Sequence, residues 1–121
     1  MDRTTGDLAF LYLTFAHASD GTIRGDEMRT LASKLRDWDP HASLESIGET
    51  LKTAVEQYKQ LGVRADRLAK AGACADSLAN QLEASQRFTV LAQLREIAEA
   101  DGTVTAEEES LLAEIRRRLG P

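Results

Sequence analysis

The sequence has few of the residues that cross-link or interrupt a chain. Its single cysteine, Cys74, excludes an internal disulfide and is typical of a reducing compartment. Two prolines and eight glycines are too few for a long linker or a disordered segment. A chain of 121 residues can bury one core without staples, so we expect a single domain over 1–121.

The sequence also has no apolar run that could cross a membrane. The longest run, LAFLYL at 8–13, is far shorter than the about 20 residues that a helical span needs. Acidic residues precede it, whereas a signal peptide begins with basic ones. We therefore expect a cytoplasmic protein.

The sequence also has fewer basic residues than acidic ones. The net charge is −5, which disfavours nucleic acid as a partner because a phosphate backbone requires a basic face. The one basic cluster, at 116–118, ends a predicted helix, where cations complement the helix dipole. We expect a solvated helix end there, the alternative being a contact to phosphate or a lipid headgroup.

What the chain does contain is apolar residues at helical spacing. Such spacing predicts helices around 8–15, 28–35, 44–58, 68–82, 91–98 and 111–119. We expect an all-α domain of six to seven helices, the seventh arising only if the third or fourth segment breaks. The first segment is apolar on nearly all sides, which is typical of a central buried helix. Short connections favour antiparallel neighbours.

An internal repeat relates the two ends of the chain. When the sequence is shifted by 81 residues, 20–32 aligns with 101–113, and Asp, Gly, Thr, Glu, Leu and Ala are identical. Ile23 against Val104 is conservative, and helical segments flank both copies. The repeat predicts two related helix–turn–helix units on either side of a central insert. An approximate two-fold axis between them would bring their acidic turns together.

The repeated turns carry half of a calcium-loop pattern. An acid, a glycine, a β-branched residue and a final glutamate match the second half of an EF-hand loop. The first half is missing, because Ala16 and Ala18 in one copy, and Ile97 and Glu99 in the other, stand at its first two ligand positions. Two half-loops could instead share one Ca²⁺ or Mg²⁺, which would relieve the repulsion among their acids. The candidate ligands are Asp20, Glu27, Asp101 and Glu108.

A purely structural role for the same turns stays open. Gly21 and Gly102 would supply positive φ after a helix end, and aspartate often hydrogen-bonds the backbone of a turn. Thr105 followed three residues later by Glu108 predicts a capping box. Every acid in the motif can therefore be explained without a cation.

The paired turns resemble a known family. The stretches IAEADGTVTAEEESLLAEI (97–115) and AHASDGTIRGDEMRTLASKL (16–35) are similar to the paired A-D-G-x-[IV]-x-x-x-E hairpins of the tellurite-resistance TerB-like domain. Ser19 departs from the usual alanine, and 41–85 carries no assignable motif. The resemblance implies an all-helical cytoplasmic bacterial protein, an acidic divalent-metal site at the turns, and a link to tellurite stress, phage defence or sensing at the membrane surface.

We expect no enzymatic activity. Two histidines and one cysteine make a zinc site unfavourable, and no nucleophile–base set or phosphate-binding glycine loop is recognisable. Trp38 is expected to cap the core rather than anchor a partner. One functional hypothesis is a metal-responsive stress or signalling module. The other is a protein-interaction or co-chaperone-like module with structural acids, whose partner is a protein and which reaches a membrane surface only through that partner.

Overall fold

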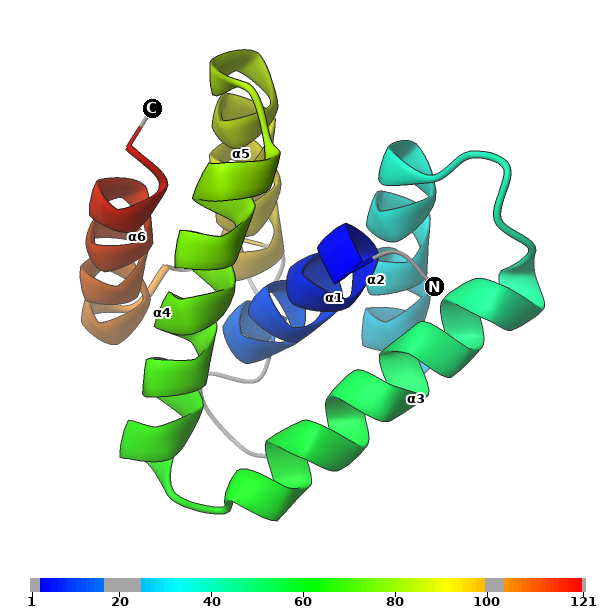
Figure 1. Ribbon diagram of the computed structural model, residues 1–121. Helices are drawn as coiled ribbons and strands as arrows, with labels where there is room; N and C mark the ends of the chain where they lie inside the picture. The colour runs from blue at the N-terminus through cyan, green and yellow to red at the C-terminus, as the bar shows by residue number, and fades with distance from the viewer. Residues whose placement is uncertain (1–2, 17–24, 100–103, 121) are drawn as a thin grey trace.

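Six helices form the described part of the computed structural model, which covers residues 3–16, 25–99 and 104–120 and contains no strand there (Figure 1). They are α1 (Arg3–Ala16), α2 (Gly25–Trp38), α3 (Leu44–Leu61), α4 (Arg64–Gln81), α5 (Ala84–Glu99) and α6 (Ala106–Leu119). The predicted all-α class is confirmed, and the third and fourth segments remain unbroken. The helices share one core and form a single compact domain.

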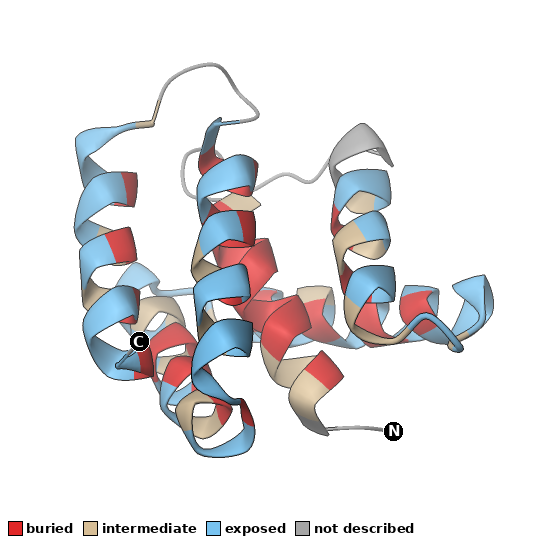
Figure 2. Ribbon diagram, turned by 90° about the horizontal axis from the view of Figure 1, so that it is seen from above, coloured by how far each residue is buried: buried red, intermediate tan, exposed pale blue. Residues whose placement is uncertain are grey.

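Helix α1 is the centre of that core. It packs against α2, α3, α4 and α5, and every residue from Leu8 to Leu13 is at most 1% exposed. Figure 2 shows it buried along most of its length between the other helices. The prediction from its all-round apolar character is thus confirmed, because a helix with neighbours on every side has no face for polar residues.

Small residues on α4 allow its neighbours to come close. Ala71, Gly72, Cys74 and Ala75 are buried where α4 packs against α1 and α6. Side chains this short let helix backbones approach at small interaxial distances. Cys74 is 5% exposed and acts as a small apolar core residue.

The helix ends follow local sequence signals. Gly62 ends α3 with φ of 65°, and Gly120 ends α6 in the left-handed conformation that glycine adopts at little cost. Helix α2 ends at Trp38, two residues before Pro40, which cannot continue a helix. The Ser43 side chain accepts a hydrogen bond from the backbone N–H of Ser46 and so caps α3.

Candidate functional site

The two repeats meet at equivalent residues. The Tyr12 hydroxyl donates a hydrogen bond of 2.5 Å to Oε1 of Gln93, and the two residues are 81 positions apart, the same offset as the repeat. A residue that contacts its own symmetry mate lies on the two-fold axis that relates the two copies. The contact between α1 and α5 therefore joins equivalent positions of the two repeats, as an approximate two-fold axis between the hairpins α1–α2 and α5–α6 would require.

A buried polar network surrounds this contact. The Trp38 indole N–H lies 2.8 Å from Oε1 of Gln93 and 3.1 Å from the Tyr12 hydroxyl, and the Gln93 amide donates to Asp37 at 3.3 Å. Burial raises the pKa of the Tyr12 phenol well above its usual value, and the negative charges of Asp37 and Glu96 add to the shift. Tyr12 is therefore a neutral donor, and Trp38 packs on the core as predicted.

Gln93 is the residue that the sequence analysis missed. It is 7% exposed, although glutamine in a helix usually faces solvent. The repeat offset could have identified it, because a shift of 81 places Gln93 opposite the aromatic Tyr12 of the central helix.

The described helix ends of both hairpins lie at one edge of the molecule. In Figure 2 the C-terminal ends of α1 and α5 and the N-terminal end of α6 lie along the upper edge, and the described turns of α2 begin near it. Asp20 and Asp101 lie outside the described residues. Glu27 lies in the first turn of α2, and its side chain is also outside the description. Of the four candidate ligands, the described structure places only the side chain of Glu108.

Glu108 performs the predicted capping role. Its Oε1 accepts a hydrogen bond of 2.9 Å from the backbone N–H of Thr105, and its own N–H donates to the Thr105 hydroxyl at 3.1 Å. The residue is 6% exposed. A carboxylate has about four lone-pair sites, so one capping bond leaves acceptor capacity for a cation. Among the described residues, no group of three or more metal-ligating side chains forms.

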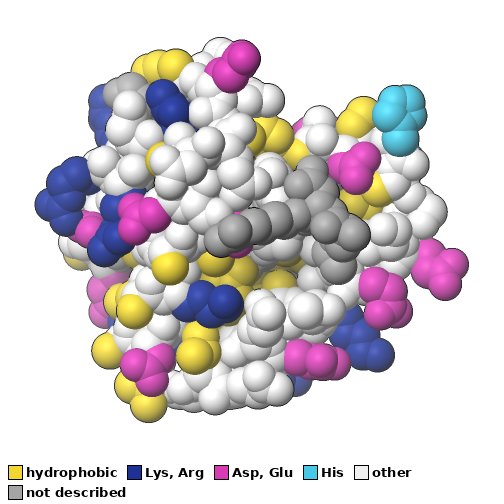
Figure 3. Space-filling view, viewed as in Figure 1, with side chains coloured by type: hydrophobic (Ala, Val, Ile, Leu, Met, Phe, Trp, Pro, Cys, Tyr) yellow, Lys and Arg dark blue, Asp and Glu magenta, His cyan; other side chains and the backbone are white. Residues whose placement is uncertain are grey.

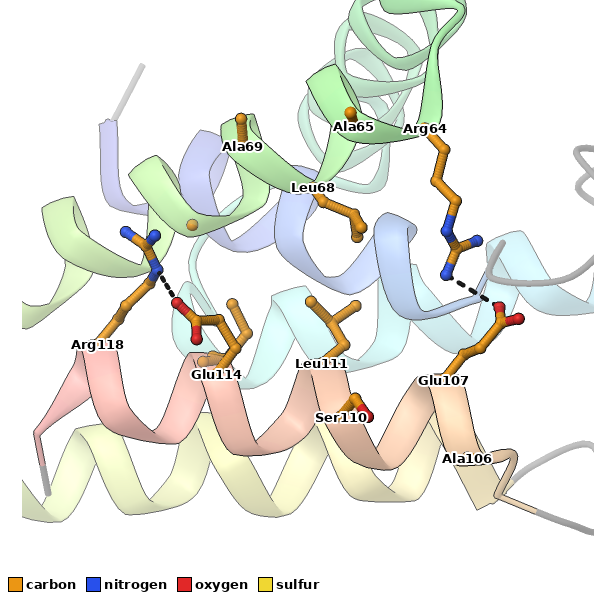
Figure 4. Close-up of a pocket in the computed structure, with 12 residues that line it drawn as sticks. Arg64, Ala65, Leu68, Ala69, Ala106, Glu107, Ser110, Leu111, Glu114 and Arg118 are labelled. Carbon is orange, nitrogen blue, oxygen red and sulfur yellow. Dashed lines mark hydrogen bonds and ion pairs between the residues drawn. The ribbon is translucent and has the colours of Figure 1, made fainter.

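A groove separates α4 from α6 (Figure 4). It has a volume of about 570 Å³ and an apolar floor that includes Leu68 and Leu111. An ion pair of 3.0 Å between Arg64 and Glu107 crosses one end, and one of 2.9 Å between Arg118 and Asp76 crosses the other. Its charged groups are therefore mutually paired.

Arg118 is exposed, as expected of the helix end, but it also contacts α4. Its guanidinium lies against Gly72, where an added Cβ would be 2.9 Å from Cζ, and reaches Asp76 on α4. The absence of a side chain at Gly72 makes this approach sterically easy. Arg116 and Arg117 are exposed, as expected, although Arg117 also pairs with Glu114 one turn earlier.

Comparison with known families yields one match. The family model described as tellurite resistance protein TerB matches residues 7–120. Searches of curated proteins and of solved structures found no match. In the described part of the chain, no helix combines the length and apolar character needed to span a bilayer.

Proposed function

Because the chain belongs to the tellurite resistance protein TerB family, we propose that this tellurite-resistance-associated domain is a non-enzymatic cytoplasmic stress-response module that binds a divalent cation where its hairpins turn. The observation that carries this proposal is the Tyr12–Gln93 contact. It joins equivalent residues of the two repeats, as an approximate two-fold axis would require, and the described helix ends of both hairpins lie along one edge. The segments that join these helix ends carry the repeated acids in the sequence, which is why we assign the cation to this edge.

The chemistry of the candidate ligands supports Ca²⁺ or Mg²⁺ rather than Zn²⁺. All four candidates offer carboxylate oxygens, which hard cations prefer, whereas structural zinc sites use cysteine and histidine. Glu108 is preorganised for such a role, because the capping box fixes its carboxylate at the start of α6. A cation would also offset the mutual repulsion of the acids that bind it.

The alternative function is a helical protein-interaction module with purely structural acids. The complete capping box of Glu108 favours it, because that acid already has a sufficient role in folding α6. In this alternative, cations have no specific effect on the stability of the domain.

Thermal unfolding separates the two functions. Millimolar Ca²⁺ or Mg²⁺ is expected to raise the melting temperature of the parent, because a ligand that binds only the folded state adds about 2.7 kcal/mol at a hundred times Kd. The variant Asp20→Asn/Asp101→Asn retains side-chain oxygens for the turns and is expected to lose that shift. Without ions it should be at least as stable as the parent, since fewer like charges repel. Circular dichroism melts of the parent and of the variant, each in EDTA and with each ion, measure these shifts.

The variant Glu108→Gln distinguishes a helix-capping role of this residue from a role as a cation ligand. Glutamine also completes a capping box, so this variant is expected to unfold within about 1 kcal/mol of the parent in EDTA. Ca²⁺ or Mg²⁺ should raise the melting temperature of this variant less than that of the parent. Glu107→Gln is the matched control, because it removes an exposed charge from the same turn and should retain the shift. A parent that ions do not stabilise, or a shift that persists in all three variants, would reject the cation site.

A further inference from the structure

A second groove runs between α5 and α6. Its volume is about 750 Å³. Apolar residues on both helices line it at helical spacing: Phe88, Leu91, Ala92, Leu112 and Ala113. We call it the α5–α6 groove. Its size falls within the range of about 300–1,000 Å³ that is usual for binding clefts.

The two ends of the α5–α6 groove differ in charge. Helices α5 and α6 are antiparallel (Figure 1), so Phe88 near the start of α5 lies at the same end as Arg116 and Arg117 near the end of α6. At the other end, Arg95 pairs with Glu109 at 3.2 Å. The groove is thus closed by an ion pair at one end and lined by two arginines beside an exposed aromatic ring at the other.

The basic end stands out in an acidic protein. Three arginines and one glutamate line the groove, whereas the whole chain has a net charge of −5. The side chain of Arg116 has no hydrogen bond or ion pair to any described residue, while the side chain of Arg117 pairs only within its own helix. Figure 3 shows basic side chains at the left, over the end of α6, with acidic side chains among them, and further acidic side chains spread over α3 at the right. This distribution favours an anionic partner.

Phe88 gives the same end an apolar anchor point. It is 57% exposed and is the only aromatic residue among the exposed large hydrophobic side chains of the described chain. The other two, Leu44 and Val63, lie outside the groove. Exposed aromatic and arginine side chains that line one concavity are the residues that most often dominate binding at protein interfaces.

We propose that the α5–α6 groove binds an acidic amphipathic helix of a partner protein. Apolar side chains spaced at i, i+3 or i+4, and i+7 on that helix pack on Phe88, Leu91 and Leu112, and its carboxylates pair with Arg116 and Arg117. A recessed apolar floor fits a helix better than the flat surface of a bilayer. The groove does not include any candidate cation ligand, so this interaction is independent of the proposed cation site.

Fluorescence anisotropy with a designed probe tests the proposal. The probe is a labelled synthetic helix of about 18 residues with leucine on one face and glutamate beside it. We expect it to bind the parent in EDTA, and to bind about tenfold more weakly to Phe88→Ala and to Arg116→Gln/Arg117→Gln. A matched peptide with lysine in place of glutamate should bind the parent protein at least about tenfold more weakly than the acidic probe does. Raising the salt concentration should weaken binding of the acidic probe, because exposed charge pairs are screened.

Matched variants and competing occupants complete the test. Leu44→Ala and Arg29→Gln/Arg36→Gln remove exposed residues from other helices and should bind the probe like the parent. Equal binding of both peptides, or no loss in Phe88→Ala, would overturn the proposal. Two other results would do the same: sedimentation with phosphatidylserine vesicles that depends on Phe88, or self-association of the parent that Phe88→Ala abolishes. Because all binding is measured in EDTA, these outcomes are distinct from failure of the cation site.

Discussion

Replacing Leu11 with alanine is expected to lower the free energy of unfolding by about 3–4 kcal/mol, within the range for fully buried leucines. Leu11 is 0% exposed in the central helix α1, which four other helices surround. The surrounding helices cannot all move inward, so the lost methyl groups leave a cavity and their transfer free energy is lost as well. Urea unfolding followed by circular dichroism measures the change.

Leu44→Ala is the matched control for this substitution. Leu44 is 67% exposed at the start of α3, so the same chemical change should alter stability by no more than about 0.5 kcal/mol. A cost below about 1 kcal/mol for Leu11→Ala would contradict the central position of α1.

Gln93→Leu is expected to cost about 2–3 kcal/mol, the penalty for leaving buried polar groups without partners. The substitution removes the acceptor of the Tyr12 hydroxyl and one of the two acceptors of the Trp38 indole. Tyr12→Phe should cost only about 1 kcal/mol, because Gln93 keeps the Trp38 donor when the hydroxyl is removed. Urea unfolding of the two single variants measures this difference.

The double variant Tyr12→Phe/Gln93→Leu provides the control. The double variant removes the Tyr12 hydroxyl together with its acceptor, but it also leaves the Trp38 N–H without either of its acceptors. The combined cost should therefore differ from the sum of the single costs by at least about 0.5 kcal/mol. Additive costs would show that the two repeats are not coupled through this contact.

Much of the fold could be predicted because the decisive signals are local. The all-round apolar character of 8–13 identifies the central helix, and Gly62 and the Thr105–Glu108 pair mark helix ends by their own conformational preferences. Local geometry is sufficient for a cap, since its donor and acceptor lie within one turn. The capping role predicted for Glu108 is therefore confirmed, whereas its role as a ligand stays a prediction.

Other features depend on tertiary packing. Gln93 is buried only because Tyr12 and Trp38 meet it from distant parts of the chain. Phe88 has the spacing of a core residue, yet it is exposed because it lines the open groove between α5 and α6. Arg118 pairs with Asp76 on another helix because Gly72 leaves room for its guanidinium. A local sequence pattern could not predict these contacts, because the partners come from distant parts of the chain.

A single cation shared by both hairpins is tested most directly by Mn²⁺ titration of the ¹⁵N-labelled protein, because this paramagnetic ion broadens the amide signals near its site. We expect the signals of Ala16 and Gly25 to broaden together with those of Glu99 and Val104, with one common midpoint and at low ion concentration. The signal of Gly62, at the corner between α3 and α4, should stay sharp, and excess Mg²⁺ should reverse the broadening. Broadening confined to one hairpin, or spread over exposed acids across the surface, would contradict a shared site.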